Sequence, residues 1–235
     1  MATEGGIIIT PLTDELYKSA LFENVGQAEL DQLTDCLSPA IKTYSQGETI
    51  VLAGYPLKEL GVVLSGTALA YAEKPDGERF LMRVMRPMSL FGELLAGSNQ
   101  ERVSPVSVYA SSKSVAVAFI EYQKVITSCG NACVGHRTLL ENMLKIVAQS
   151  YFTLFERLGL LREKSLRTRL TAYFSALEKG QGTGTVTLPF SKSTLAEYLF
   201  VNRSAMQKEL AKMEADGLIA VSGRRIALKE IYKSY

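Results

Sequence analysis

The stretch from Ser191 to Ile219, SKSTLAEYLFVNRSAMQKELAKMEADGLI, predicts how the rest of the chain is organised. Its apolar residues recur at helical spacing in two blocks separated by a short break: Leu195, Tyr198 and Leu199, then Met206, Leu210 and Met213. Ser191 and Asn202 can accept backbone N–H bonds at two helix starts, and Gly217 can end the second helix in the left-handed conformation. The pattern predicts two helices that close at an angle, a helix-turn-helix.

The second predicted helix has a polar face opposite its apolar stripe. At helical spacing this face carries Arg203, Ser204, Gln207, Lys208 and Lys212. Such side chains donate hydrogen bonds to base edges and phosphates. We therefore interpret the segment as a recognition helix that binds double-stranded DNA, assisted by polar residues near the two helix starts, Ser191, Ser193 and Asn202. An αα-hairpin with a solvated polar face is the alternative.

Charge is distributed unevenly along the 235 residues, although the formal net charge is only +2. Residues 1–156 hold 12 Lys and Arg against 17 Asp and Glu, a net of −5, whereas residues 157–235 hold 14 against 7, a net of +7. This asymmetry is typical of a DNA-binding domain joined to a neutral or acidic partner domain. A solvated basic surface is the alternative.

Compartment is predicted from the termini and the cysteines. The start MATEGG lacks basic residues, and no apolar run approaches the roughly 20 residues that span a bilayer. Cys36, Cys129 and Cys133 are an odd number without framework spacing, which suits a reducing compartment. We expect a cytoplasmic protein that does not enter a membrane.

The hydrophobic period changes along the first half of the chain. Residues 12–38 predict one or two short helices, and residues 41–120 predict short strands separated by glycine-containing turns. Pro75-Asp76-Gly77 is the clearest hairpin turn. The strand region predicts an antiparallel roll or barrel.

Residues 134–161 predict one long helix. Leu140, Val147, Leu154 and Leu161 recur every seven residues, as in a coiled-coil seam, and the intermediate seam positions are Met143, Ser150 and Arg157. A second apolar set is predicted to face the roll: Leu139, Ile146, Phe152 and Phe155. The alternatives are a helix that pairs with its twin in a dimer and a buried core helix of a monomer.

The segment from Gly47 to Gly97, GETIVLAGYPLKELGVVLSGTALAY…DGERFLMRVMRPMSLFGELLAG, resembles the cyclic-nucleotide-binding β-roll of the CRP–FNR family of bacterial transcription regulators. With the helix-turn-helix, the resemblance extends from about residue 21 to 228. It implies an α+β fold in which an effector-sensing antiparallel β-roll at 1–133, a long dimerisation helix at 134–161 and a winged helix-turn-helix at 162–235 follow one another. It favours a homodimer on a two-fold symmetric DNA site, and it implies RNA polymerase as a further partner.

The resemblance also predicts how the wing and the recognition helix contact DNA. A strand at 186–188 would precede the helix-turn-helix, and a hairpin of strands at 219–221 and 225–228 would form the wing. The wing tip, Arg224-Arg225, would lie on the phosphate backbone. Arg203 falls on the arginine that reads guanine in the family. Ser204 falls where many members have glutamate, and Phe200 falls in a turn usually given to glycine. These differences imply a different target sequence.

The effector site departs from the nucleotide-binding pattern. After Phe91-Gly92-Glu93-Leu94, nucleotide-binding members hold the cyclic phosphate with an Arg-Ser or Arg-Ala pair, but here Ser104 and Pro105 stand at that position. Pro105 lacks an N–H donor, and Arg102 is out of register. We expect an unknown small-molecule effector other than cyclic AMP. The residues predicted to bind it are Gly92, Glu93, Leu94, Arg102 and Ser104.

Cofactor chemistry has little support in the sequence. Iron–sulfur members of the family carry an N-terminal cysteine cluster, whereas no cysteine precedes Cys36, and the only histidine available to a haem is His136. We predict no metal, no catalytic residue and no enzymatic activity. The competing hypothesis is a small-molecule-binding or enzymatic β-roll protein whose C-terminal helices mediate protein contacts, but such enzyme sites usually gather two or more imidazoles.

Overall fold

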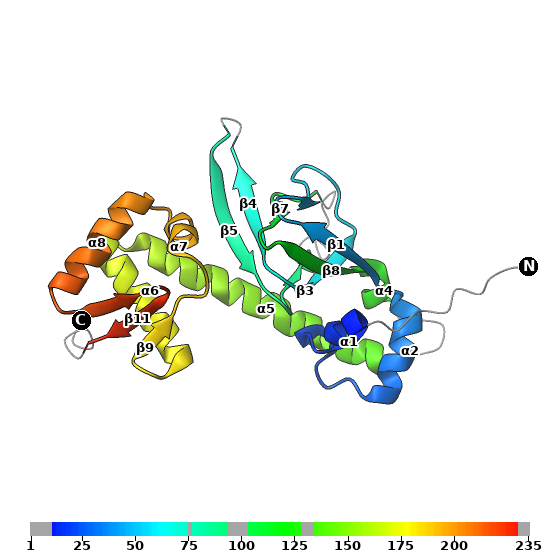
Figure 1. The fold of residues 1–235 in the computed structure, drawn as a ribbon. Coiled ribbons are helices and arrows are strands. Elements are labelled where there is room, and N and C mark those ends of the chain that lie inside the picture. Colours follow the sequence, from blue (N-terminus) through cyan, green and yellow to red (C-terminus); the bar gives the residue numbers. More distant parts are fainter. Residues whose placement is uncertain (1–10, 75–76, 94–102, 128–133, 230–235) are drawn as a thin grey trace, which may run out of the picture. The chain divides into compact units, whose positions relative to one another are not determined.

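The computed structural model describes residues 11–74, 77–93, 103–127 and 134–229 (Figure 1). It forms two compact units, Met1–Tyr151 and Phe152–Tyr235. The predicted α+β class is confirmed, with antiparallel sheets first, then a long helix, then a helix-turn-helix. The predicted three-segment boundaries stay a prediction. Within the described ranges, no helix is long and apolar enough to span a membrane.

The first unit begins with three short helical segments, in the region where one or two helices were expected. These are α1 (Pro11–Tyr17), the 3₁₀ helix η1 (Ala20–Phe22) and α2 (Gln27–Leu37). Their leucines form an apolar cluster with one face of the roll; among them, Leu16, Leu21, Leu33 and Leu37 are almost completely buried. The helices therefore cover the outer face of one of the two sheets of the roll.

Two four-stranded antiparallel sheets make the predicted roll. The order β1-β8-β3-β6 combines β1 (Ala40–Ser45), β8 (Ser114–Glu121), β3 (Glu59–Ser65) and β6 (Leu90–Phe91). The order β2-β7-β4-β5 combines β2 (Thr49–Val51), β7 (Ser107–Ala110), β4 (Ala68–Glu73) and β5 (Arg79–Met85). The expected hairpin joins β4 to β5, although Pro75 and Asp76 lie outside the described residues.

Strands β3 and β8 form the centre of this unit. Both are buried over almost their whole length, because one face packs against the helices and the other faces the second sheet. Burial on both faces explains why their sequences, GVVL and VAVAFI, are continuous apolar runs without alternation. Between the sheets, the Phe91 ring lies over Gly61, where an added Cβ would come within 2.0 Å of the ring.

Helix α4 (Tyr122–Ile126) precedes the long helix α5 (Val134–Arg162). Leu139 and Met143 are buried in the cluster that contains α1 and α2. Met143 therefore faces this unit's own core, and its predicted place on the coiled-coil seam is wrong. Phe152 and Phe155 were predicted to face the roll, yet they are exposed, Phe155 by 64%.

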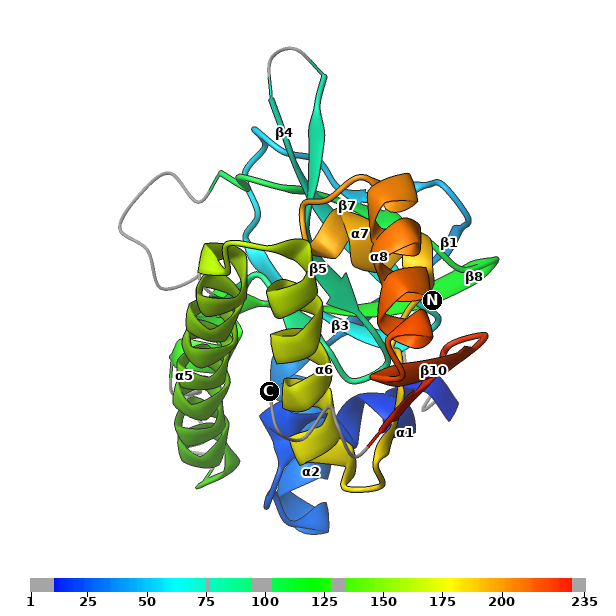
Figure 2. The same cartoon turned by 90° about the vertical axis from the view of Figure 1, so that its left-hand side faces the viewer.

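The second unit is a small helical domain with a three-stranded sheet. Helix α6 (Leu166–Gln181) precedes β9 (Thr185–Thr187). Helices α7 (Lys192–Tyr198) and α8 (Arg203–Ala215) are followed by β10 (Ile219–Ser222) and β11 (Arg225–Leu228), in the sheet order β10-β11-β9. Figure 2 shows α8 beside α7, with the β10 hairpin at its end. A single apolar cluster joins these elements, with Phe174 at 0% exposure.

Candidate nucleic-acid interface and effector site

Side-chain caps start both helices of the helix-turn-helix, as the sequence predicted. Ser191 Oγ accepts a hydrogen bond from the Thr194 N–H at 3.1 Å. Asn202 Oδ1 accepts bonds from the Ser204 N–H at 2.8 Å and from the Ser204 hydroxyl at 2.7 Å. These caps satisfy backbone donors that would otherwise lack partners at the helix starts. Asn202 and Ser204 therefore have a structural role in addition to any contact with DNA.

The outer face of α8 is open, and its inner face is buried. Met206, Leu210 and Met213 have at most 4% exposure and pack in the core of the unit. The residues predicted to read DNA from this helix are all exposed: Arg203, Ser204, Gln207, Lys208 and Lys212. Of the residues near the helix starts, Ser191 and Asn202 are exposed and Ser193 is half-buried. Helical periodicity thus brings the predicted donors of α8 together on one surface.

Glu209 of α8 and its C-cap residue Asp216 are paired with an arginine of α6. Arg167 of α6 donates from Nε to Glu209 and from Nη1 to Asp216, each at 2.6 Å. These two hydrogen bonds raise the pKa of the Arg167 guanidinium. They also orient α8 on α6 and neutralise negative charge that would oppose a phosphate backbone. Sequence reasoning missed this anchor, because its partners lie 42 and 49 residues from Arg167.

The wing is the β10–β11 hairpin. Its two strands pair from Ile219 with Leu228 to Ser222 with Arg225, and Gly223 in the turn has a φ of 59°. The Leu188 N–H donates to the Arg224 carbonyl at 2.8 Å, so the backbone of the turn is held by the chain before α7. The side chains of Arg224 and Arg225 are exposed, as a contact with phosphate requires.

A buried arginine of α5 contacts the end of α7, just before the turn that leads to α8. Arg157 has 5% exposure, and its Nη2 donates to the Tyr198 carbonyl at 3.0 Å. Burial lowers the pKa of Arg157, and burial raises the pKa of the neighbouring Tyr198 phenol, an effect that the positive charge of Arg157 opposes. Arg157 was predicted on the coiled-coil seam, and this assignment is wrong because its side chain faces the helix-turn-helix.

Two of the predicted effector residues, Gly92 and Glu93, lie at a buried junction of the first unit. Gly92 has a φ of 86°, and a Cβ there would lie 2.9 Å from the Glu59 carbonyl oxygen, so only glycine fits. The Glu93 side chain is 3% exposed. Its Oε1 accepts from Arg83 Nη1 of β5 at 2.8 Å and from the Ser150 hydroxyl of α5 at 3.0 Å. Glu93 therefore links the second sheet to the long helix.

The Ser150 hydroxyl is therefore bonded within the first unit, and the predicted place of Ser150 on the seam stays a prediction. Neither Arg83 nor Ser150 was selected from the sequence as a site residue. Their partner, Glu93, lies 10 residues from Arg83 and 57 residues from Ser150. No periodic pattern predicts such a meeting.

Ser104 is buried, and its backbone and hydroxyl are bonded within the first unit. Its N–H donates to the Tyr55 carbonyl at 2.9 Å, its carbonyl accepts from the Gly54 N–H at 2.8 Å, and its hydroxyl donates to the Val106 carbonyl at 2.7 Å. These donors are therefore used by the chain itself. Leu94 and Arg102 lie outside the described residues.

Met88 lies in the turn that precedes β6. It has a φ of 72°, so this turn keeps a conformation that glycine adopts more readily. Its N–H donates to the Val63 carbonyl at 2.8 Å, which holds the turn against β3. A residue other than glycine therefore holds a left-handed conformation at this turn.

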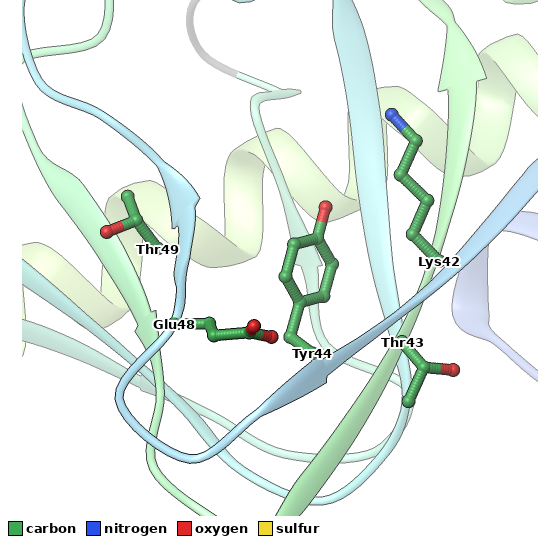
Figure 3. A pocket seen from close by; sticks show the side chains of 5 residues that line it. All are labelled: Lys42, Thr43, Tyr44, Glu48 and Thr49. Carbon is green, nitrogen blue, oxygen red and sulfur yellow. The ribbon is translucent and has the colours of Figure 1, made fainter.

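An open hollow of ≈ 570 Å³ lies along the edge strands β1 and β2 and is lined by Lys42, Thr43, Tyr44, Glu48 and Thr49 (Figure 3). Lys42 Nζ lies 5.2 Å from the centroid of the Phe119 ring. Burial raises the pKa of the Tyr44 phenol, and the charges of Glu59 and Glu48 add to this effect. The hollow contains none of the predicted effector residues.

Metal-binding side chains do not gather in the part of the chain that the structure describes, where no group of three or more His, Cys, Asp or Glu could hold an ion. His136 is buried, and its Nε2 is 3.1 Å from the Lys124 carbonyl, an interaction that holds α4 against the start of α5. Cys129 and Cys133 lie outside the described residues.

Comparison with known proteins places both halves of the chain. Residues 41–129 match the family described as "Cyclic nucleotide-binding domain", and residues 168–233 match the "Crp-like helix-turn-helix domain". A sensing β-roll joined to such a domain defines a class of transcription regulators. The chain belongs to the CRP–FNR family of this class. Members of the family bind DNA, typically as dimers.

Individual relatives agree with this assignment. The CRP-like cAMP-activated global transcriptional regulator of Mycobacterium tuberculosis is 21% identical over 220 residues, which cover 92% of this chain and 94% of the relative. The structure of the c-di-GMP responsive global regulator CLP of Xanthomonas campestris has a TM-score of 0.67 at 16% identity, covering 86% of this chain and 99% of that one. FixK2 of Bradyrhizobium japonicum gives 0.63 at 17%, covering 83% and 94%.

Proposed function

We propose that this CRP–FNR regulator acts as a cytoplasmic homodimer that binds a two-fold symmetric DNA site through α8 and the wing, and that it is not an enzyme. The observation that carries the proposal is the outer face of α8, where five polar residues are exposed above a buried apolar stripe. Each subunit would place one such helix in a major groove.

The positions of the exposed side chains on α8 and the wing suggest which of them read bases and which bind phosphates. Arg203 is the first residue of α8, where side chains reach base edges, and a bidentate contact with guanine discriminates bases by about 1–3 kcal/mol. Ser204 and Gln207 flank it on the exposed face. Lys212 near the helix end and Arg224 on the wing are better placed for phosphates, which add affinity without sequence preference.

The exposed strip of α5 supports the dimer. Its residues follow one another at alternating spacings of four and three residues, the pattern of a two-helix seam: Leu140, Leu144, Val147, Tyr151, Leu154 and Leu158. Val147 is half-buried and the other five are exposed. Leu144 is 71% exposed and Leu158 is 52% exposed, an unusual exposure for leucine unless a partner covers it. The predicted positions Leu140, Val147 and Leu154 belong to this strip, whereas Leu144, Tyr151 and Leu158 replace the intermediate positions chosen from sequence.

The effector would act near Glu93, where the roll and α5 meet through Arg83 and Ser150. A small molecule that competes for these bonds would change the contact between the roll and the helix. Cyclic nucleotides are poor candidates, because the Ser104 N–H and hydroxyl already donate to the carbonyls of Tyr55 and Val106, and Pro105 offers no N–H donor. RNA polymerase would be the partner through which bound protein affects transcription.

The test is selection of binding sites from a random DNA pool, followed by titration at several salt concentrations. We expect selected sites with two half-sites whose centres lie about 10 base pairs apart, and an affinity that falls steeply with salt. Selected sites without two-fold symmetry would contradict the dimeric arrangement. Salt-dependent DNA binding that is absent altogether would favour the protein-contact alternative.

A further inference from the structure

Arg157 makes three contacts with the turn between α7 and α8. Its Nη2 donates to the Tyr198 carbonyl at 3.0 Å, and its Cζ lies 4.2 Å from the centroid of the Tyr198 ring and 5.0 Å from that of the Phe200 ring. The guanidinium thus lies against two aromatic rings while it binds the backbone between them. A buried cation is costly unless such partners compensate for lost water.

Phe200 explains why the contact is specific to this turn. Its φ is 53°, a left-handed conformation that disfavours bulky side chains and that glycine adopts without strain. An aromatic residue at this position gains the contact with Arg157, which glycine would lose. The contact with Arg157 therefore helps to stabilise the left-handed conformation of Phe200, and the Phe200 ring helps to compensate the buried charge of Arg157.

A second arginine holds the next carbonyl of the same turn. Arg169 of α6 donates from Nη1 to the Leu199 carbonyl at 2.9 Å, and from Nη2 to the Glu163 carbonyl at 3.2 Å. The consecutive carbonyls of Tyr198 and Leu199, at the C-terminal end of α7, thus bind two guanidinium groups. Positive charge is favoured at this end of a helix. Because α8 begins at Arg203, the two arginines fix the backbone that aims the recognition helix.

The neighbours of Arg157 along α5 belong to the exposed strip. Leu154 and Leu158 are 47% and 52% exposed, whereas Arg157 between them is buried against the helix-turn-helix. This segment of α5 therefore presents one face to the proposed dimer partner and another to the turn before α8. Both contacts are made within little more than one helical turn, from Leu154 to Leu158, so a change in how α5 pairs would also change the direction of α8.

We propose that Arg157 is a positioning residue that sets the angle of the recognition helix on α5, so that the dimer seam fixes the distance between the two recognition helices. This inference rests on the proposed function. Arg157 does not touch DNA in this scheme. Its effect is on the spacing of half-sites that the dimer accepts, rather than on the bases read in each half-site.

The test compares Arg157→Met, which keeps length and apolar bulk but removes charge and donors, with Arg157→Lys, which keeps charge without the planar fork. Arg162→Met, at an exposed arginine in the last turn of the same helix, is the matched control. Each protein is titrated with the selected palindrome, with palindromes one base pair longer or shorter, and with a single half-site. Sedimentation checks that each variant is dimeric.

We expect the wild type and Arg162→Met to discriminate against altered spacing, and Arg157→Met to lose about tenfold of that discrimination, equal to about 1.4 kcal/mol. Arg157→Lys should lose part of it. Affinity for a single half-site should stay within about twofold for all variants, since the base-reading side chains are unchanged.

Full spacing discrimination in a dimeric Arg157→Met protein would overturn the inference, as would an equal loss in the Arg162→Met control. If Arg157→Met does not fold, Arg157→Lys provides the test, and full spacing discrimination in a dimeric Arg157→Lys protein would also overturn the inference. A wild-type protein without a two-fold site would instead contradict the proposed function.

Discussion

The two units differ in how far their predicted site residues are exposed to solvent. On α8, Arg203, Gln207 and Lys212 are exposed to solvent. In the roll, Glu93 and Ser104 are buried and bonded to other parts of the first unit. DNA is a large partner that binds to the outside of the protein, so the side chains that donate to it can remain solvated until it binds. A small effector must instead displace or extend bonds that the roll already makes.

This contrast predicts different consequences for mutation. The exposed site residues Arg203, Gln207 and Lys212 on α8 should affect DNA binding while leaving the free energy of unfolding unchanged. Site residues in the roll should affect the free energy of unfolding even without effector. The long helix, whose exposed strip runs through both units, should affect every readout that depends on the dimer.

The largest effect is expected from the exposed strip of α5. The double variant Leu144→Glu with Leu154→Glu should be monomeric, because it removes apolar contact and places like charges opposite their symmetry mates. DNA affinity should fall with dimerisation. Analytical ultracentrifugation and DNA titration measure both changes. Thr153→Glu, at an exposed position beside the strip, is the control and should remain a dimer. A dimeric double variant would place the seam elsewhere.

A smaller effect is expected from the buried carboxylate of the roll. Glu93→Ala removes the acceptor for Arg83 and Ser150 and should lower the free energy of unfolding by about 1.5–3 kcal/mol. Glu78→Ala, which breaks an exposed ion pair with Lys74, should cost less than about 0.5 kcal/mol. Urea unfolding without effector measures the difference. Equal, small changes in the two variants would remove the contrast between the units.

The recognition helix should show the reverse behaviour. Arg203→Ala should leave unfolding within about 0.5 kcal/mol of the wild type, because the side chain is exposed. It should lower discrimination at one base pair of each half-site by about 1–3 kcal/mol.

Lys212→Ala should instead weaken binding to all DNA sequences alike and reduce the salt slope by about one per lost contact. Competition titrations with single-base variants of the selected site distinguish the two patterns. Unaltered discrimination by Arg203→Ala would refute its role as a base reader.

The smallest effect is expected from alkaline pH. Burial raises the pKa of Tyr198 above its usual value of about 10, so the unfolded chain releases this proton first as the pH rises. The folded state then binds more protons than the unfolded state, and the free energy of unfolding decreases above about pH 10, whereas below that pH the phenol contributes no pH dependence.

Tyr198→Phe should reduce this decrease in the second unit. Burial also raises the pKa of Tyr17 and Tyr44, so part of the decrease should remain in the first unit. Thermal unfolding at a series of pH values, with phenolate absorbance recorded in parallel, measures both contributions. An unchanged pH profile in Tyr198→Phe would show that its phenol does not contribute.

The sequence by itself determined the local elements and their order. Two blocks of apolar residues at helical spacing, with Ser191 and Asn202 as caps, were sufficient to predict α7 and α8, because caps and amphipathic stripes depend on residues within one or two turns. The exposed face of α8 follows from the same periodicity. The positive φ at Phe200 agrees with the expectation, taken from the family resemblance, that this turn usually holds glycine.

Only the tertiary structure decided which face of α5 meets which neighbour. Apolar residues lie on more than one face of this helix, so a seven-residue repeat could be drawn through Met143, Ser150 and Arg157 or through Leu144, Tyr151 and Leu158. Contacts separated the two sets: Ser150 bonds Glu93, 57 residues away, and Arg157 bonds Tyr198, 41 residues away. Such pairings depend on how distant elements pack, and the spacing of residues along one helix carries no information about them.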